Sequence, residues 1–275
     1  MITQGLQQIK LTEMIYFSFI DSLELGLYFV IIGYYFLIFA YFLIMRFRVS
    51  KRLYWLFFSL LFLALAISRG FFILYYFYAP ETRSVSLMML SYRFALFFTW
   101  IAISCLMGML GIFLFPPEGS LKDESTEKQK EYLKYVMRIA LIIAPIIIGI
   151  IALTLPDRLL IDKEFLSEFW IFISIKPNAV LGYPVGRFVI NLILQPLFNF
   201  LIPIMFFYLA KRTFGVLRKS YALNGTGFLL YYLGRLSYSI LGVLNAPNTQ
   251  AVIPPLIILL SLLLIVIANS FEALK

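Results

Sequence analysis

The chain has 275 residues and a formal net charge of +9; 62% of its residues are hydrophobic and only 13% are charged. Its mean hydropathy is +0.93. A soluble domain is about half apolar and about a quarter charged, so this composition excludes a soluble globular protein and indicates an integral membrane protein.

The residue types that are missing exclude several kinds of chemistry. The chain has no histidine and one cysteine, Cys105, which lies in an apolar run. Imidazole catalysis, imidazole or thiolate metal sites and intrachain disulfides are therefore excluded, and we expect no metal and no cofactor. We expect Cys105 to be a small buried hydrophobic residue. Most basic residues flank apolar segments, where membrane topology explains them, so no nucleic-acid partner is expected.

Seven segments of the chain are apolar enough to cross a bilayer, which takes about 20 residues in a helix. They lie at roughly 19–45, 53–79, 86–115, 135–155, 188–210, 221–244 and 251–270. The turn-forming cluster 245–250, with Pro247 and two asparagines, separates the last two. We therefore predict one all-α membrane domain, residues 1–275, folded as a seven-transmembrane-helix bundle.

Lysine and arginine are concentrated in the connections on one side of this predicted bundle. That side carries Arg46, Arg48, Lys51, Arg52, Lys122, Lys128, Lys130, Lys134, Arg138, Lys211, Arg212, Arg218, Lys219 and Lys275. The opposite side carries only Lys10, Arg83, Arg158, Lys163, Lys176 and Arg187. The positive-inside rule then places the N-terminus outside and the C-terminus inside. We expect a multi-pass protein of the cell membrane, with the lipid bilayer as its surroundings and span 1 as an uncleaved anchor.

Two connections carry patterns of their own. In the inner loop 116–134, the four-residue spacing of Glu124 and Lys128 favours a short solvated helix that extends toward span 4. The outer loop 156–187 contains an amphipathic stretch, 164–172. That stretch is suited either to the membrane interface or to capping an outward-facing cavity.

The chain contains an internal similarity when it is shifted by 166 residues. The shift aligns Arg46 with Arg212, Arg52 with Arg218, and Arg69 with Arg235. In both copies the intramembrane arginine is followed 10 or 11 residues later by Ala-Pro-x-Thr. We predict a parallel 3+1+3 repeat with units 17–115 and 183–270 and the linker span 135–155. Parallel repeats occur in transporters, where the solute binds between the units.

The three-one-three arrangement resembles the topology of SWEET-type sugar transporters, and this resemblance implies a transport function. It covers topology only, because the Pro-Gln motif of that wider family is absent and Gln195-Pro196 has the reverse order. Seven-span receptors share the predicted orientation. A retinal protein needs a Schiff-base lysine in span 7, and Lys275 lies beyond that span, so retinal binding is disfavoured.

Two arginines lie deep within predicted spans. Arg69 and Arg235 each follow an inner basic loop by about 16 residues, or ~24 Å of helix, which puts both in the outer third of the membrane. Charges inside spans usually face a cavity or a partner, and guanidinium groups suit carboxylates and phosphates. We predict that both, together with Arg93, line an outward-facing ligand pocket. The alternative, which is favoured for Arg93, is snorkelling to the outer interface or pairing with Asp21 or Glu24.

Polar residues on spans 5 and 6 extend this predicted pocket. Asn191, Gln195 and Asn199 recur every four residues, so they form one stripe that should face the bundle interior. Tyr231 and Tyr238 share a face of span 6 with Arg235. The alternative is interhelical hydrogen bonding without a ligand.

Small residues and prolines on spans 5 and 6 have structural interpretations. Asn224 begins a glycosylation triplet, but it lies inside span 6. The glycines of that span, at positions 225, 227 and 234, are expected to permit close helix contacts. Pro196 and Pro203 are expected to bend span 5.

The sequence favours a binding or transport function over catalysis. No acidic residue occupies the middle of a span, and we find no phosphate-binding loop or credible nucleophile–base pair, so we expect no enzyme. Our first hypothesis is a permease for a small anionic or polar solute, facilitated rather than proton-driven. The alternatives are a seven-span sensor that signals to a separate cytoplasmic partner, or a subunit of a larger membrane complex.

Overall fold

The computed structural model describes residues 19–79, 84–114, 126–161, 179–180, 183–244 and 246–270. The amphipathic outer stretch 164–172, residues 116–125 of the inner loop, and the first Ala-Pro-x-Thr after Ala79 lie outside these ranges. Within them the protein is almost entirely helical, which confirms the predicted all-α class. Two-residue strands β1 (Ala179–Val180) and β2 (Tyr183–Pro184) pair antiparallel.

The helices of the described residues form seven long segments. The first joins α2 (Phe19–Ala40), the π-helical η1 (Tyr41–Phe47) and α3 (Arg48–Ser50), and the second joins α4 (Leu53–Ile73) and η2 (Leu74–Tyr78). The next two are α6 (Val85–Leu114) and α7 (Thr126–Thr154), and the short η3 (Asp157–Leu159) follows. The fifth joins α9 (Val185–Arg187), the π-helical η4 (Phe188–Leu194) and α10 (Gln195–Arg212). The last two are α11 (Gly215–Val243) and α12 (Pro247–Ser270).

Six of these segments are long and apolar enough to cross a membrane, so the protein is a multi-pass membrane protein. The exception is α11, whose length is ample but whose hydropathy is lowered by residues such as Arg218, Asn224 and Arg235. Arg218 is exposed near the start of the helix, whereas Asn224 is buried and Arg235 is hydrogen-bonded to Gln195 of α10, so the two deeper polar residues face protein rather than lipid. The seven-span count and the orientation therefore stay predictions.

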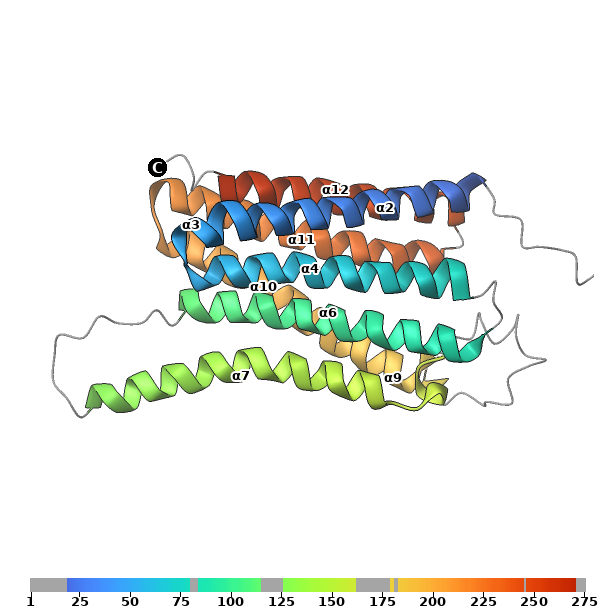
Figure 1. The fold of residues 1–275 in the computed structure, drawn as a ribbon, viewed down its shortest axis with the longest axis horizontal. Coiled ribbons are helices and arrows are strands. Elements are labelled where there is room, and N and C mark those ends of the chain that lie inside the picture. Colours follow the sequence, from blue (N-terminus) through green and yellow to red (C-terminus); the bar gives the residue numbers. More distant parts are fainter. Residues whose placement is uncertain are drawn as a thin grey trace, which may run out of the picture.

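Six of the segments pack side by side in a closed ring. Within each predicted repeat unit the middle helix lies between its neighbours, α4 between α2 and α6, and α11 between α10 and α12. The ring closes through contacts of α12 with α2 and of α6 with α10 (Figure 1). A half-turn about the bundle axis would exchange α2 with α10, α4 with α11 and α6 with α12, and this exchange leaves the order of neighbours around the ring unchanged. A parallel repeat would give the same order. The repeat itself stays a prediction.

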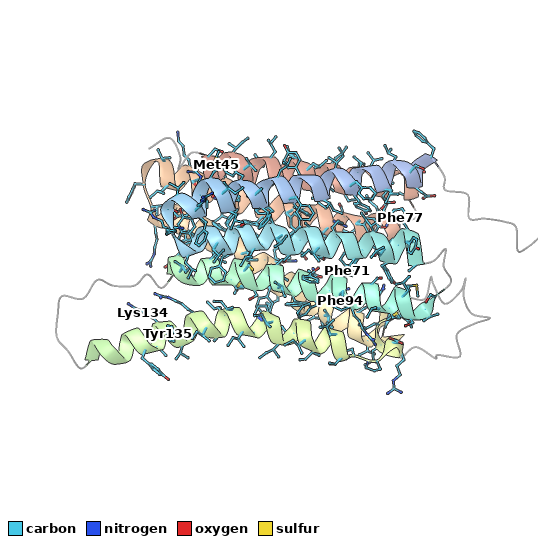
Figure 2. All side chains as sticks on the ribbon, viewed as in Figure 1. Met45, Phe71, Phe77, Phe94, Lys134 and Tyr135 are labelled. Carbon is cyan, nitrogen blue, oxygen red and sulfur yellow. The ribbon has the colours of Figure 1, made fainter. Side chains whose placement is uncertain are left out.

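Helix α7 lies outside this ring, where it packs along α6 (Figure 1). Close contact is possible because Gly149 faces Trp100, and Ser104 donates a hydrogen bond to the Ile142 carbonyl at 2.8 Å. The first turns of α7 stand apart from α6, with Lys134 and Tyr135 on that part (Figure 2). Helix α7 thus begins within the inner loop 116–134, as the predicted short helix extending toward span 4 requires.

The basic connections gather at one end of the bundle, on the left of Figure 1. The end of α3, the turn between α10 and α11, and the start of α7 all lie there. The lateral surface is apolar, with large side chains such as Leu37, Leu197 and Ile204 exposed, as a lipid environment requires. We refer to the basic end as the predicted inner end.

The glycines of α11 are positions of close helix contact, which confirms their predicted role. A Cβ atom at Gly227 would lie 2.6 Å from Cγ1 of Ile265, and one at Gly234 would lie 3.0 Å from Cγ1 of Ile258, both on α12. Gly225 faces Phe207 of α10 at 3.0 Å in the same way. Because α11 lacks these methyl groups, it can approach α12 and α10 closely enough to complete the ring.

We expect Gly227→Ala to lower the free energy of unfolding by about 1–3 kcal/mol, because the new methyl group overpacks the α11–α12 contact. The matched control is Gly33→Ala on α2, where no atom lies within 4 Å of the added methyl group. That control should be neutral or slightly stabilising. Thermal unfolding in detergent measures both, and equal stability of the two variants would contradict the contact.

The crossing of α11 can be tested by labelling its two ends. In a Cys105→Ala background we expect Phe214→Cys and Leu244→Cys to react with a membrane-impermeant maleimide from opposite sides of the membrane. Both positions are exposed and flank the 29-residue helix α11. Labelling of both cysteines from the same side would reduce the count to six spans.

Candidate functional site

Two adjoining cavities lie inside the six-helix ring. The first, which we call the arginine cavity, is lined by Tyr35, Leu65, Ser68, Arg69, Phe72, Thr99, Tyr231 and Arg235. The second, the apolar cavity, is lined mainly by leucine, isoleucine and phenylalanine side chains, together with Thr99, Asn199, Tyr231, Tyr232 and Arg235. Leu65, Thr99, Tyr231 and Arg235 line both cavities. The empty volume, open entrance included, is about 250 Å³ for the arginine cavity and about 490 Å³ for the apolar cavity. Both are narrow, and each admits roughly two water molecules.

Arg69 reaches the arginine cavity from α4. Its guanidinium carbon lies 4.7 Å from the ring centre of Tyr28 on α2, a cation–π contact. Tyr28 in turn donates a hydrogen bond of 2.7 Å to the Glu24 carboxylate. The ion pair found among the described residues is that of Arg93 with Asp157, and Glu24 is linked to Arg69 through Tyr28. Its positive charge is balanced only at a distance.

Arg235 reaches the same cavity from α11, on the other side of the ring. With the Gln195 amide oriented so that its oxygen faces α11, this oxygen accepts hydrogen bonds from Nη1 and Nη2 of Arg235 at 2.8 and 2.9 Å. Gln195 is buried, and its neutral amide orients the guanidinium group without cancelling its charge. No ion pair of Arg235 occurs within the described residues.

Hydroxyl groups complete the polar wall of the arginine cavity. Tyr35 of α2 donates a hydrogen bond to the Tyr231 hydroxyl of α11 at 3.1 Å, across the ring. The hydroxyl oxygens of Ser68 and Thr99 lie 2.8 Å apart between α4 and α6, and both lie within hydrogen-bond distance of the Ala95 carbonyl oxygen, at 2.8 and 2.9 Å. The cavity therefore offers hydroxyl and guanidinium donors and contains no carboxylate among its lining residues.

The polar stripe on span 5 faces neighbouring helices along its length. Asn191 donates a hydrogen bond of 2.9 Å to the Tyr92 hydroxyl of α6, Gln195 holds Arg235, and Asn199 lines the apolar cavity. Asn191 lies in η4, the π-helical segment that ends just before Pro196, and it is outside both cavities. The stripe thus contributes to the site through Gln195 and Asn199.

Two of the predicted site residues have other partners. Arg93 forms an ion pair with Asp157 at 2.6 Å and donates to the Leu155 carbonyl at 2.5 Å, so it fixes the end of α7 to α6. The sequence favoured a structural role for Arg93, but it named Asp21 and Glu24 as the possible partners and not Asp157. Tyr238 lies beside Tyr76, with ring centres 6.4 Å apart, and lines neither cavity.

Sequence reasoning missed Tyr35, Ser68 and Thr99. Tyr35 looked like a packing tyrosine, because a single tyrosine in an aromatic span gives no indication of which helix it faces. Ser68 directly precedes Arg69, and a single serine in an apolar span carries no pattern that marks it as a site residue. Thr99 has no polar neighbour on its own helix, and only the contact between α4 and α6 brings it to Ser68.

A second polar cluster closes the predicted inner end of the ring. Asn269 of α12 donates to the Asn224 side chain of α11 at 2.9 Å, and Arg46 donates to the Asn269 carbonyl at 2.9 Å. The Arg46 guanidinium also lies 5.3 Å from the ring centre of Trp55. Asn224 is 3% exposed, which agrees with a buried structural role. Cys105 is buried as predicted.

The comparisons with known proteins give no family assignment. No protein-family model matches the chain, and neither a curated protein nor a solved structure matches it significantly. The interpretation of the site therefore rests on its own geometry.

We expect Arg93→Gln to lower the free energy of unfolding by about 1–3 kcal/mol, because it removes charge-assisted hydrogen bonds to Asp157 and Leu155. Asp157→Asn should have a smaller effect in the Arg93→Gln background than alone. A double-mutant cycle by thermal unfolding measures this coupling. Strictly additive effects would show that the pair contributes nothing to stability.

Proposed function

We propose that the protein binds a small anion between Arg69 and Arg235 and allows it to cross the membrane as a facilitated permease. The observation that carries this proposal is the convergence of two guanidinium groups on one cavity whose lining contains no acid. A positive charge within a membrane is costly unless it has a partner, and a bound anion supplies that partner.

The donors around the cavity suit a carboxylate or a phosphate. Guanidinium groups bind such oxygens with paired, charge-assisted hydrogen bonds. Gln195 fixes the direction of the Arg235 guanidinium in advance, which lowers the entropic cost of binding. The Tyr231 hydroxyl lines the same space, and because it accepts a hydrogen bond from Tyr35 its own hydrogen is available to an oxyanion.

The position of the cavity supports transport. It lies between α4 and α11, the middle helices of the two predicted repeat units, and in parallel-repeat transporters the solute binds between the units. No carboxylate lines the cavities to carry a coupled proton. We therefore propose passive movement, and we propose no catalytic activity.

Binding is tested with purified protein in detergent, using phosphate and acetate as probes. An anion present at 100 times its Kd should stabilise the fold by about 2.7 kcal/mol, which raises the unfolding temperature. We expect Arg69→Gln and Arg235→Gln each to weaken binding about tenfold or more. Arg93→Gln, a matched loss of one arginine outside the cavities, should bind as the wild type does.

Transport is tested by counterflow of the labelled anion in proteoliposomes. We expect uptake that saturates, that is lost in Arg69→Gln, and that does not respond to an imposed pH gradient. Proton-dependent uptake would contradict the facilitated mechanism. Binding without any flux would contradict transport and favour the sensor function, whereas no binding of either probe would contradict the anion site itself.

A further inference from the structure

The two cavities differ in chemistry, and the difference follows the axis of the bundle. On α4 the lining residues change from Leu61 and Phe62 to Ser68 and Arg69 toward the predicted outer end. On α11 the order is the same, from Phe228 through Tyr231 to Arg235. On both middle helices the arginine thus lies on the outer side of the apolar residues that line the apolar cavity, and on α4 Phe72 lies one turn beyond it.

The remaining walls repeat this order. On α6, which runs in the opposite direction, Thr99 lies on the outer side of Ala102 and Leu106. On α10, Asn199 lies on the outer side of Ile202. Helix α12 contributes only apolar residues to the inner part of the cavity. Helices that run in opposite directions therefore both place their polar lining residues on the outer side of their apolar ones. The change from polar to apolar lining is thus a property of the whole cavity.

We infer that the ligand is an amphiphilic anion, a carboxylate or phosphate headgroup on a short unbranched apolar chain, with the chain in the apolar cavity. This inference rests on the proposed anion site and adds the class of ligand. The headgroup lies between Arg69 and Arg235, and the chain extends toward Phe62 and Phe228. Because Arg235 and Tyr231 border both cavities, one molecule can occupy the two spaces at once.

The size of the apolar cavity sets the length of the chain. Its free space admits roughly two water molecules, so only the first few methylene groups gain from burial there. Each buried methylene contributes about a fourfold increase in affinity. A longer chain has to displace the packed side chains of the inner part, where Ile265 and Leu262 are almost fully buried.

The test is a series of straight-chain carboxylates, from acetate to butyrate, hexanoate and octanoate, with the Kd measured by calorimetry on the full chain. We expect the affinity to rise about fourfold per methylene from acetate to butyrate and to level off by octanoate. The uncharged alcohols of the same chain lengths should bind at least tenfold more weakly, because they cannot pair with the two guanidinium groups.

Two variants separate the chain from the headgroup. Ala102→Leu fills the apolar cavity and should reduce the affinity for butyrate to that for acetate, while acetate binding stays unchanged and reports an intact fold. Ile202→Ala enlarges the same space and should move the plateau to longer chains. Arg69→Gln should weaken binding of every acid in the series by the same factor.

Four outcomes would overturn the inference. If acetate binds and the affinity is independent of chain length, the anion site stands and the amphiphilic ligand is wrong. If the affinity still rises as steeply from hexanoate to octanoate, the ligand is a long-chain membrane lipid rather than a short-chain acid. If the alcohols bind as tightly as the acids, apolar partitioning explains the trend. If no acid binds, the inference falls together with the proposed anion site.

Discussion

The need to balance two positive charges inside an apolar bundle is the constraint on which the candidate site depends. Arg69 and Arg235 enter one cavity from opposite sides of the ring, and their contacts are an aromatic face and a neutral amide. Neither contact cancels a full charge, because aromatic rings and amides supply only partial charges. In the proposed function, an anion between the two guanidinium groups supplies the missing negative charge.

The ring of six helices explains how both arginines come to the same place. Each is on the middle helix of its group of three, and the groups meet through α2 with α12 and α6 with α10. The closeness of α11 to its neighbours depends on Gly227 and Gly234, which leave space for isoleucine side chains of α12. Helix α11 therefore carries polar residues into the ring, and of these Asn224 is buried between helices while Arg235 is held by Gln195 of α10.

Sequence reasoning reached the class of fold and part of the site because those features are local. Hydropathy identifies spans, and counting residues from a basic loop gives the depth of Arg69 and Arg235 without knowledge of their neighbours. The four-residue spacing of Gln195 and Asn199 similarly reveals a shared face. Of the seven segments predicted as spans, however, α11 is the one whose average hydropathy is too low for hydropathy alone to establish a crossing, although this helix completes the ring.

The remaining features are tertiary, and no local pattern encodes them. The ion pair of Arg93 with Asp157 joins residues 64 positions apart, and Asn191 meets Tyr92 across 99 positions. Which helices are neighbours decides these pairs, and the sequence alone leaves that order open. The same holds for the axial change from polar to apolar lining, which becomes visible only when helices running in both directions are aligned.

The most direct test of the central claim is a crystal structure of the protein soaked in bromide, with the anomalous signal used to locate the ion. The account predicts an anomalous peak between the guanidinium groups of Arg69 and Arg235, within reach of both, and its loss in Arg235→Gln crystals. Arginine side chains that point out to the lipid, or a cavity without a peak at saturating bromide, would contradict it.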